Sequence, residues 1–226
     1  MSVVSDPAFR DGVRAGIPYA VAAILLGISF GVLAEPVMGS VAPIVMSAAL
    51  FAGSAQFAAT AVLGAGGGAA AAILAGILLN ARYGPMGIAI APSLRGGRAR
   101  RAAAGLAMID FSWAAANRGG GRFDIAFMLG ATLPSYPMWV VGTAIGVLAG
   151  DLIGDPEALG LDALFPAFFL ALLVQGELRP GPPAVAAGLG AALALVLVPF
   201  VPAGIPIIAA SAAALVGLWH RPEGGP

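Results

Sequence analysis

The sequence has neither cysteine nor lysine, and it has a single histidine. The lack of cysteine excludes disulfides and thiol chemistry. Because all eleven basic side chains are arginine, Schiff-base chemistry and proton release from a lysine are excluded as well. Any coupling to protons therefore has to use a carboxylate.

Charge is scarce too. Charged residues make up 10% of the chain and the formal net charge is zero, so nothing in the sequence points to nucleic acid. We find no His and carboxylate cluster for a metal, no phosphate-binding loop, and no serine with a histidine in the apolar region. The sequence therefore predicts neither an enzyme nor a cofactor.

Long apolar stretches dominate the chain. Its 226 residues are 60% hydrophobic, include 33 glycines and have a mean hydropathy of +0.96. The apolar stretches are continuous, which suits helices and not the alternating strands of a membrane barrel. Eight such segments follow one another: 12–34, 41–63, 69–92, 102–116, 123–150, 161–174, 183–201 and 205–219. We predict an all-α, polytopic transmembrane bundle of six to eight membrane segments, forming a single integral membrane transporter domain over residues 1–226.

Arginine placement indicates that some of these segments do not cross. Arginines gather at five sites: Arg10 and Arg14; Arg95, Arg98, Arg100 and Arg101; Arg118 and Arg122; Arg179; and Arg221. Short loops rich in arginine stay on the cytoplasmic side, which leaves Glu35 and the acidic stretch 151–162 outside. This arrangement requires an odd number of crossings between Glu35 and Arg95 and an even number between Arg101 and Arg118. At least two segments are then broken or re-entrant, unless all eight cross and the arginine rule is violated.

Local residues favour three places for the breaks. The motif Phe51–Phe57 has Gly53, Ser54 and Gln56 in mid-segment. The dipeptide Gly84-Pro85 interrupts the next segment, and the segment 102–116, with Asp110 near its centre, is short for a crossing. Irregular backbone at membrane depth is tolerated only where it is buried in protein or lines a cavity.

A faint internal echo links the two halves of the chain. Gly27-Ile-Ser-Phe-Gly-Val-Leu-Ala34 resembles Gly142-Thr-Ala-Ile-Gly-Val-Leu-Ala149, and each is followed by an acidic loop and a Phe-rich segment with a glutamine. Transporters are often built from two related halves, so an internal two-fold repeat is one interpretation. The other, which we prefer for the glycines, is close helix packing through small residues.

Four polar side chains stand out because they lie where hydrocarbon is expected: Gln56, Asn80, Arg82 and Asp110. Such residues usually face a bundle interior or a water-filled cavity and mark a solute path. A planar guanidinium at Arg82 suits a carboxylate, and free amides at a break near Gly53 and Ser54 suit one equally.

Each of these residues also has a structural interpretation. Arg82 pairs with Asp110 or extends to the interface, and Gln56 ties helices together. Asp110 is the candidate for proton coupling or for binding an ammonium group, because burial favours a neutral carboxyl. The aromatic candidates for the pocket wall are Phe51, Phe57, Tyr83 and Trp113.

The spaced motifs resemble the AzlC family over nearly the whole chain. The resemblance rests on Phe51-Ala-Gly-Ser-Ala-Gln-Phe57, Asn80-x-Arg82-Tyr83-Gly84, Asp110, Trp139-x-x-Gly142-Thr143-x-x-Gly146 and Gly160-Leu-Asp162. It implies a branched-chain amino-acid exporter for leucine, isoleucine and valine, often with methionine, working with a small hydrophobic AzlD-type partner in the inner membrane. The chain departs from the family at Phe111, where a glutamate is common, and at Tyr83, where a histidine is common, which puts proton coupling in doubt at these two positions.

Two classes of function fit the residues. The first is a multi-pass secondary exporter driven by the proton-motive force and working by alternating access. The second is a channel or facilitator for another small solute, which needs no titrating carboxylate. Retained transport in an Asp110→Asn variant would favour the second.

Overall fold

The chain is described from a computed structural model, which covers residues 5–153, 181–201 and 205–218 and isolated positions between 154 and 180. Within these residues the regular structure is helical, and the sole β-type pairing is an isolated bridge between Asn117 and Phe123. The α-helices are α1 (Pro7–Met38), α2 (Ala42–Ala49), α3 (Gly53–Gly64), α4 (Ala69–Asn80), α5 (Tyr83–Ile90), α6 (Arg98–Leu106), α7 (Asp110–Ala116), α8 (Ile125–Thr132), α9 (Ser135–Ile153), α11 (Pro182–Leu197) and α12 (Ile205–Ser211). Two 3₁₀ helices, η2 (Ala91–Ser93) and η4 (Ala212–Leu218), complete the set.

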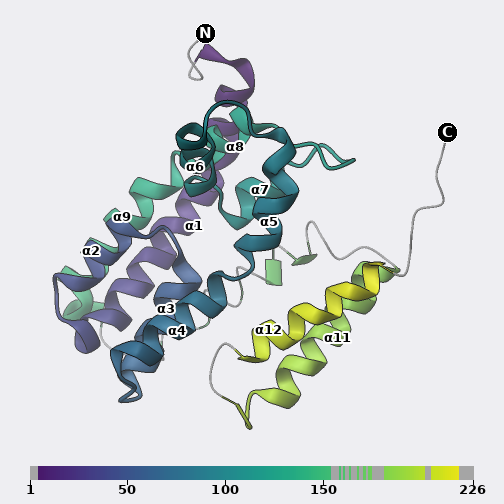
Figure 1. The fold of residues 1–226 in the computed structure, drawn as a ribbon. Coiled ribbons are helices and arrows are strands. Elements are labelled where there is room, and N and C mark those ends of the chain that lie inside the picture. Colours follow the sequence, from purple (N-terminus) through teal and green to yellow (C-terminus); the bar gives the residue numbers. More distant parts are fainter. Residues whose placement is uncertain are drawn as a thin grey trace.

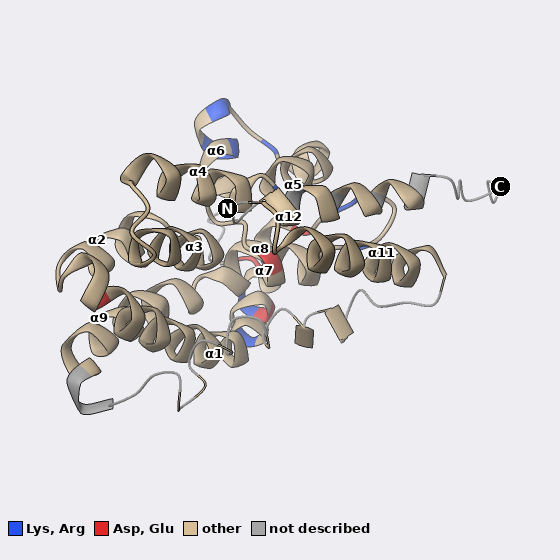
Figure 2. Cartoon of the chain, turned by 90° about the horizontal axis from the view of Figure 1, so that it is seen from below, with Lys and Arg blue, Asp and Glu red and all other residues tan. Residues whose placement is uncertain are grey.

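Three helical stretches of the described chain are long and apolar enough to cross a membrane: Pro7–Met38, Ala69–Ser93 and Ile125–Gly150. Pro182–Leu197 is a shorter apolar helix. Figure 2 shows that charged residues occupy only a few places along the helices. The predicted fold class, a helical membrane bundle with broken segments, is confirmed.

Helix α1 packs in parallel along α8 and α9 (Figure 1). Gly12 lies against Phe127, and further along the same interface Gly31 lies against Val147. A Cβ at Gly27 would be 2.6 Å from the Trp139 carbonyl oxygen, so the two backbones touch directly. Small residues allow such an approach. The glycines of the internal echo therefore serve helix packing, as preferred above, and the two-fold repeat itself stays a prediction because most of the segment after Ile153 lies outside the described residues.

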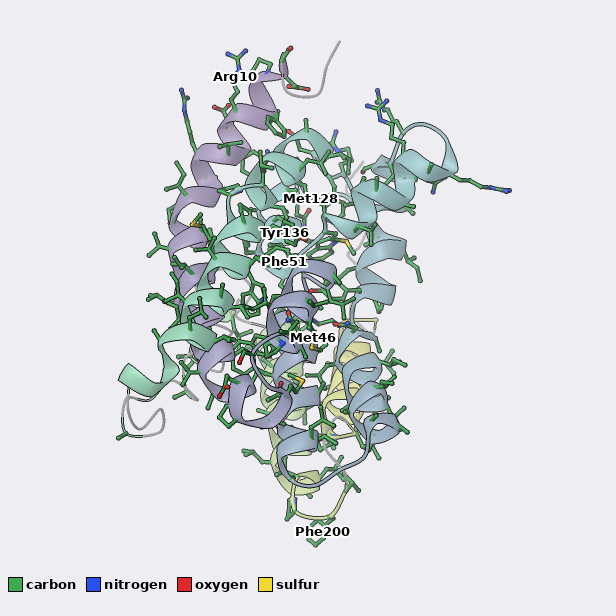
Figure 3. The ribbon with its side chains drawn as sticks, turned by 90° about the vertical axis from the view of Figure 1, so that its left-hand side faces the viewer. Arg10, Met46, Phe51, Met128, Tyr136 and Phe200 are labelled. Atoms are coloured by element: carbon green, nitrogen blue, oxygen red, sulfur yellow. The ribbon has the colours of Figure 1, made fainter. Side chains whose placement is uncertain are left out.

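Helices α2 and α3 form a re-entrant hairpin. The chain leaves helical geometry at Leu50 and returns to it at Gly53. The far end of α3, at Gly64, lies against Val37 near the end of α1 from which α2 also starts. The segment therefore enters and leaves at one end of the bundle, with its tip in the middle, where Figure 3 shows Phe51.

Helices α6 and α7 form a second hairpin, which enters from the opposite end. The Phe123 amide, in the loop from α7 to α8, donates a hydrogen bond of 3.0 Å to Ser93 Oγ, at the end of η2 and before α6. At the tip, Thr132 Oγ1 donates a hydrogen bond of 2.7 Å to the Ala107 carbonyl, which lies outside both helices. The predicted break in 102–116 is therefore present.

The third break lies three residues earlier than expected. Helix α4 ends at Asn80 and α5 begins at Tyr83, so the chain is interrupted at Ala81 and Arg82. Gly84-Pro85 instead occupies the first turn of α5. Proline is tolerated there because the first amides of a helix have no intrahelical partner.

Together these turns satisfy the arginine pattern for the described residues. With α2–α3 and α6–α7 re-entrant, one crossing, α4–α5, separates Glu35 from Arg95. Asp6, Arg95, Arg100 and Arg122 line one surface depression, and Arg10 lies at the same end in Figure 3. We call this the arginine end of the bundle. The predicted positions Arg179 and Arg221 lie outside the described residues.

The last two α-helices form a hairpin of their own. Helices α11 and α12 pack on each other, and α12 contacts α4 (Figure 1). Seven of the eight apolar segments found in the sequence fall on described helices, while most of 161–174 lies outside them.

Candidate functional site

A cavity of about 70 Å³ lies where the three breaks meet in the interior. Its wall is completed by the middle of α1 and the start of α9. The lining residues are Tyr19, Ala23, Leu26, Phe51, Gly53, Ser54, Arg82, Tyr83, Ile109, Asp110, Phe111, Ser135 and Trp139. We call this space the central cavity.

The central cavity contains an ion pair between Arg82 and Asp110. Arg82 Nε donates to Asp110 Oδ1 at 2.9 Å and Nη2 donates to Oδ2 at 3.0 Å. The pair is therefore bidentate, the geometry in which a guanidinium binds a carboxylate best. About a quarter of each side chain is exposed, so the pair borders the cavity and is not sealed off from it.

Neighbouring groups hold the guanidinium in place. Arg82 Nη1 donates a hydrogen bond of 2.7 Å to the Leu79 carbonyl in the last turn of α4, a turn whose carbonyls lack intrahelical donors. The Tyr83 ring lies 4.7 Å from the guanidinium carbon, and its hydroxyl donates to Asp110 Oδ2 at 3.4 Å. The break in α4–α5 and the start of α7 are thus joined through one charged cluster.

Two hydroxyl groups on the cavity wall have no hydrogen-bond partner among the residues that the structure describes. Ser54, in the first turn of α3, is 7% exposed, and Ser135, the first residue of α9, is 1% exposed. The Oγ atom of each is buried and unpaired. Buried polar groups in proteins are normally paired, so these two hydroxyls indicate a place where a polar ligand or water belongs.

Gln56 lies in a buried polar network and not on the wall of the central cavity. Its Nε2 donates to Ser47 Oγ at 2.9 Å, and Trp139 Nε1 donates to the same oxygen at 3.1 Å. Thr143 Oγ1 donates to the Trp139 carbonyl, so Ser47 must give its own proton to Thr143 across their 2.8 Å contact. The network ties the α2–α3 hairpin to α9.

Aromatic side chains form much of the apolar wall. Tyr19 stacks on Phe111, with ring centroids 4.0 Å apart and planes within 7° of parallel. Phe51 contacts Tyr136 edge to face at 5.3 Å. Outside the wall, the Tyr136 hydroxyl donates to the Ala48 carbonyl and thereby anchors the end of α2.

The structure divides the candidates chosen from sequence into two groups. Those on the central cavity are Phe51, Gly53, Ser54, Arg82, Tyr83 and Asp110. The others lie elsewhere: Gln56 is in the buried network, and Phe57 packs edge to face on Phe30 at 5.5 Å. Trp113 donates to the Met86 carbonyl, and Asn80 lines two neighbouring hollows.

Sequence reasoning missed the contributions of α1 and α9. Tyr19, Ser135 and Trp139 line the cavity, yet each lies in a segment that reads as an ordinary apolar span. Trp139 belongs to a sequence motif, but the motif does not indicate a place on the cavity wall. Ser135 directly follows Pro134 and lies two positions before Pro137, and this pair of prolines is the sequence signal for an interruption there.

Comparisons with known proteins agree on one family. The family model described as AzlC protein matches residues 18–153. The chain is 31% identical over 173 residues to the branched-chain amino acid transport protein AzlC of Bacillus subtilis (strain 168), covering 74% of this chain and 67% of the relative.

Two further relatives are similar over most of their length. The inner membrane protein YgaZ of Escherichia coli (strain K12) is 29% identical over 211 residues, which is 87% of this chain and 84% of that protein. An uncharacterized membrane protein of Archaeoglobus fulgidus is 33% identical over 221 residues, or 96% and 98%. No solved structure gives a significant match.

Proposed function

The chain belongs to the AzlC family, and we propose that it is the large membrane subunit of a secondary exporter of branched-chain amino acids. A membrane transport role follows from the family. Leucine, isoleucine and valine are the proposed substrates, with methionine as a further one, because a relative of similar sequence is named for branched-chain amino-acid transport.

The proposed location is the cytoplasmic (inner) membrane, with several crossings. One relative is named an inner membrane protein. The arginine end of the bundle then faces the cytoplasm, as short arginine-rich loops do, and the two re-entrant hairpins enter from opposite sides.

The observation that carries the proposal is the central cavity between broken helices. Secondary transporters place their substrate near the midplane, at discontinuous helices whose ends supply polar groups. A branched-chain amino acid needs groups for its two charges and an apolar wall for its side chain. The cavity offers Arg82 and Asp110, two free hydroxyls, and a wall that includes Leu26 and Ile109.

Asp110 is the proposed proton carrier. A proton on its carboxyl removes the negative charge and weakens the bidentate pair with Arg82. Loss of that pair loosens the connection between the α4–α5 break and α7. If this loosening opens the cavity toward the opposite side of the membrane, protonation of Asp110 is coupled to release of the amino acid.

A small hydrophobic AzlD-type membrane protein is the proposed partner, and lipid covers the remaining apolar surface. Exposed apolar side chains are plentiful on α4 and α11, including Ile73, Ile77 and Leu195. The AzlD-type partner is proposed from the family resemblance.

The test is efflux of preloaded isoleucine from cells without their own exporters, expressing this chain with and without its small partner. We expect efflux when both proteins are expressed. Efflux should be lost in Asp110→Asn although the amount of the variant in the membrane equals that of the wild type. Efflux retained in Asp110→Asn would favour a channel or facilitator. No isoleucine efflux in any combination would remove branched-chain amino acids from the proposal.

A further inference from the structure

The N-terminus of α3 opens onto the central cavity. Gly53 and Ser54, its first two residues, both line the cavity, and no side chain caps the helix. The first amides of a helix have no intrahelical partner and carry the positive end of the helix dipole. This end of α3 is therefore suited to an anion.

Two side chains add independent evidence for a ligand at this place. Ser54 Oγ and Ser135 Oγ are buried without partners, and both residues line the same cavity. The hydroxyls come from α3 and α9, which are far apart in sequence. A hydroxyl donates readily to a carboxylate oxygen, and such a bond is stronger than one between neutral groups.

The guanidinium in the cavity is already engaged. Arg82 uses Nε and Nη2 for Asp110 and Nη1 for the Leu79 carbonyl. A substrate carboxylate that took the guanidinium fork would have to displace Asp110 and leave that carboxylate without its counter-ion.

We infer that the carboxylate of the transported amino acid binds at the start of α3, held by the Gly53 and Ser54 amides and by the hydroxyls of Ser54 and Ser135. This rests on the proposed function. The ammonium group then faces Asp110, whose Oδ1 accepts from Arg82 Nε at 2.9 Å and whose Oδ2 accepts from Arg82 Nη2 at 3.0 Å and from Tyr83 at 3.4 Å. The apolar side chain lies against Leu26 and Ile109. Arg82 acts on the site through Asp110 and does not touch the carboxylate.

The ligand test compares L-isoleucine with L-isoleucinamide, which keeps the ammonium group and the side chain but has a neutral amide for the carboxylate. Binding of each is measured on the full-length chain in lipid nanodiscs, alone and with its small partner. We expect isoleucine to bind at least tenfold more tightly than the amide. The ratio of the two affinities does not depend on the fraction of protein that is folded.

The matched variants are Ser54→Ala and Ser135→Ala, with Ser29→Ala as control. Ser29 is equally buried but does not line the cavity. Each cavity variant should weaken isoleucine binding about tenfold, the usual effect of losing one hydrogen bond to a charged group, with little change for isoleucinamide. Ser29→Ala should keep the wild-type ratio.

The outcomes separate this inference from the proposed function. If wild-type protein binds isoleucine and the two serine variants keep its preference over the amide, the inference is wrong and the proposed function stands. A preference that disappears in Arg82→Gln but not in the serine variants would put the carboxylate on Arg82. If the wild-type chain binds no isoleucine, alone or with its partner, both are overturned.

Discussion

The interface of α1 with α8 and α9 and the wall of the central cavity are built on opposite principles. At the interface, glycine removes side chains so that backbone touches backbone, as at Gly27 and Trp139. At the cavity, the backbone leaves helical geometry, and the wall is formed by side chains that include an ion pair and two unpaired hydroxyls. One region has no room for an added atom, whereas the other has polar groups that still lack partners.

This difference indicates which region is rigid and which can rearrange. A close-packed interface cannot slide without losing its contacts, because added or displaced atoms meet carbonyl groups on both sides. An ion pair and a few hydrogen bonds can exchange partners at little change in free energy. We therefore expect α1, α8 and α9 to act as the frame and the two re-entrant hairpins as the moving parts.

The largest expected effect comes from filling the frame. A valine at Gly31 would place its Cβ 2.8 Å from the Val147 amide nitrogen and 3.0 Å from the Gly146 carbonyl carbon. Both are backbone atoms, so no side chain can rotate away to make room. Gly31→Val should lower the free energy of unfolding by about 3 kcal/mol or more. Thermal unfolding of the purified chain in detergent measures the change.

The control for this variant is Gly87→Val in α5. Nothing lies within 4 Å of a Cβ at Gly87, and valine and glycine differ by only a few tenths of a kcal/mol in a helix. Equal losses in the two variants would show that the glycine interface has no special role.

A medium effect is expected from the ion pair. Arg82→Ala leaves Asp110 without its counter-ion. Breaking a fully buried pair costs about 3–5 kcal/mol, and because a quarter of each side chain is exposed we expect about 2 kcal/mol. Adding Asp110→Asn to Arg82→Ala should restore part of that stability, as a double-mutant cycle in chemical unfolding would measure. Additive losses would mean that the two side chains do not interact.

The smallest effect is expected at the link between frame and hairpin. Gln56→Leu removes one donor to Ser47, which keeps Trp139 and Thr143 as partners. The loss of stability should be about 0.6 to 1 kcal/mol, seen as a small drop in the midpoint of thermal unfolding. The transport rate should fall by more than the small loss of stability would explain, because the α2–α3 hairpin loses an anchor to α9. If transport were unchanged in Gln56→Leu, the network would not help to position the hairpin.

The sequence predicted the breaks because their physical cause is local. Polar residues such as Ser54 and Asp110 inside apolar segments, and the arginine pattern between them, are visible without knowing any neighbour. The exact position of the third break was misjudged, because Pro85 reads as an interruption although it fits the first turn of α5.

The neighbours across the bundle were beyond such reasoning. That α1 runs parallel to α9 depends on which of several glycine-rich helix faces pack together. These faces have similar sequences in different helices, so the sequence does not indicate which two of them pair. The direction of Gln56 toward Ser47 and the place of Ser135 on the cavity wall follow from that pairing. Sequence therefore located the tips of the hairpins but not the frame they face.

The parallel pairing of α1 with α9 has a consequence for synthesis of the chain. Gly31 and its contact Val147 are 116 positions apart in the sequence (147 − 31). A ribosome adding about 5–20 residues per second needs roughly 6 to 23 s to make the intervening chain. During that interval the glycine face of α1 has no α9 to meet, although α2–α3 has already been made. Helix α1 thus waits for α9, and release of the chain before Ile153 would leave α1 without its main contact.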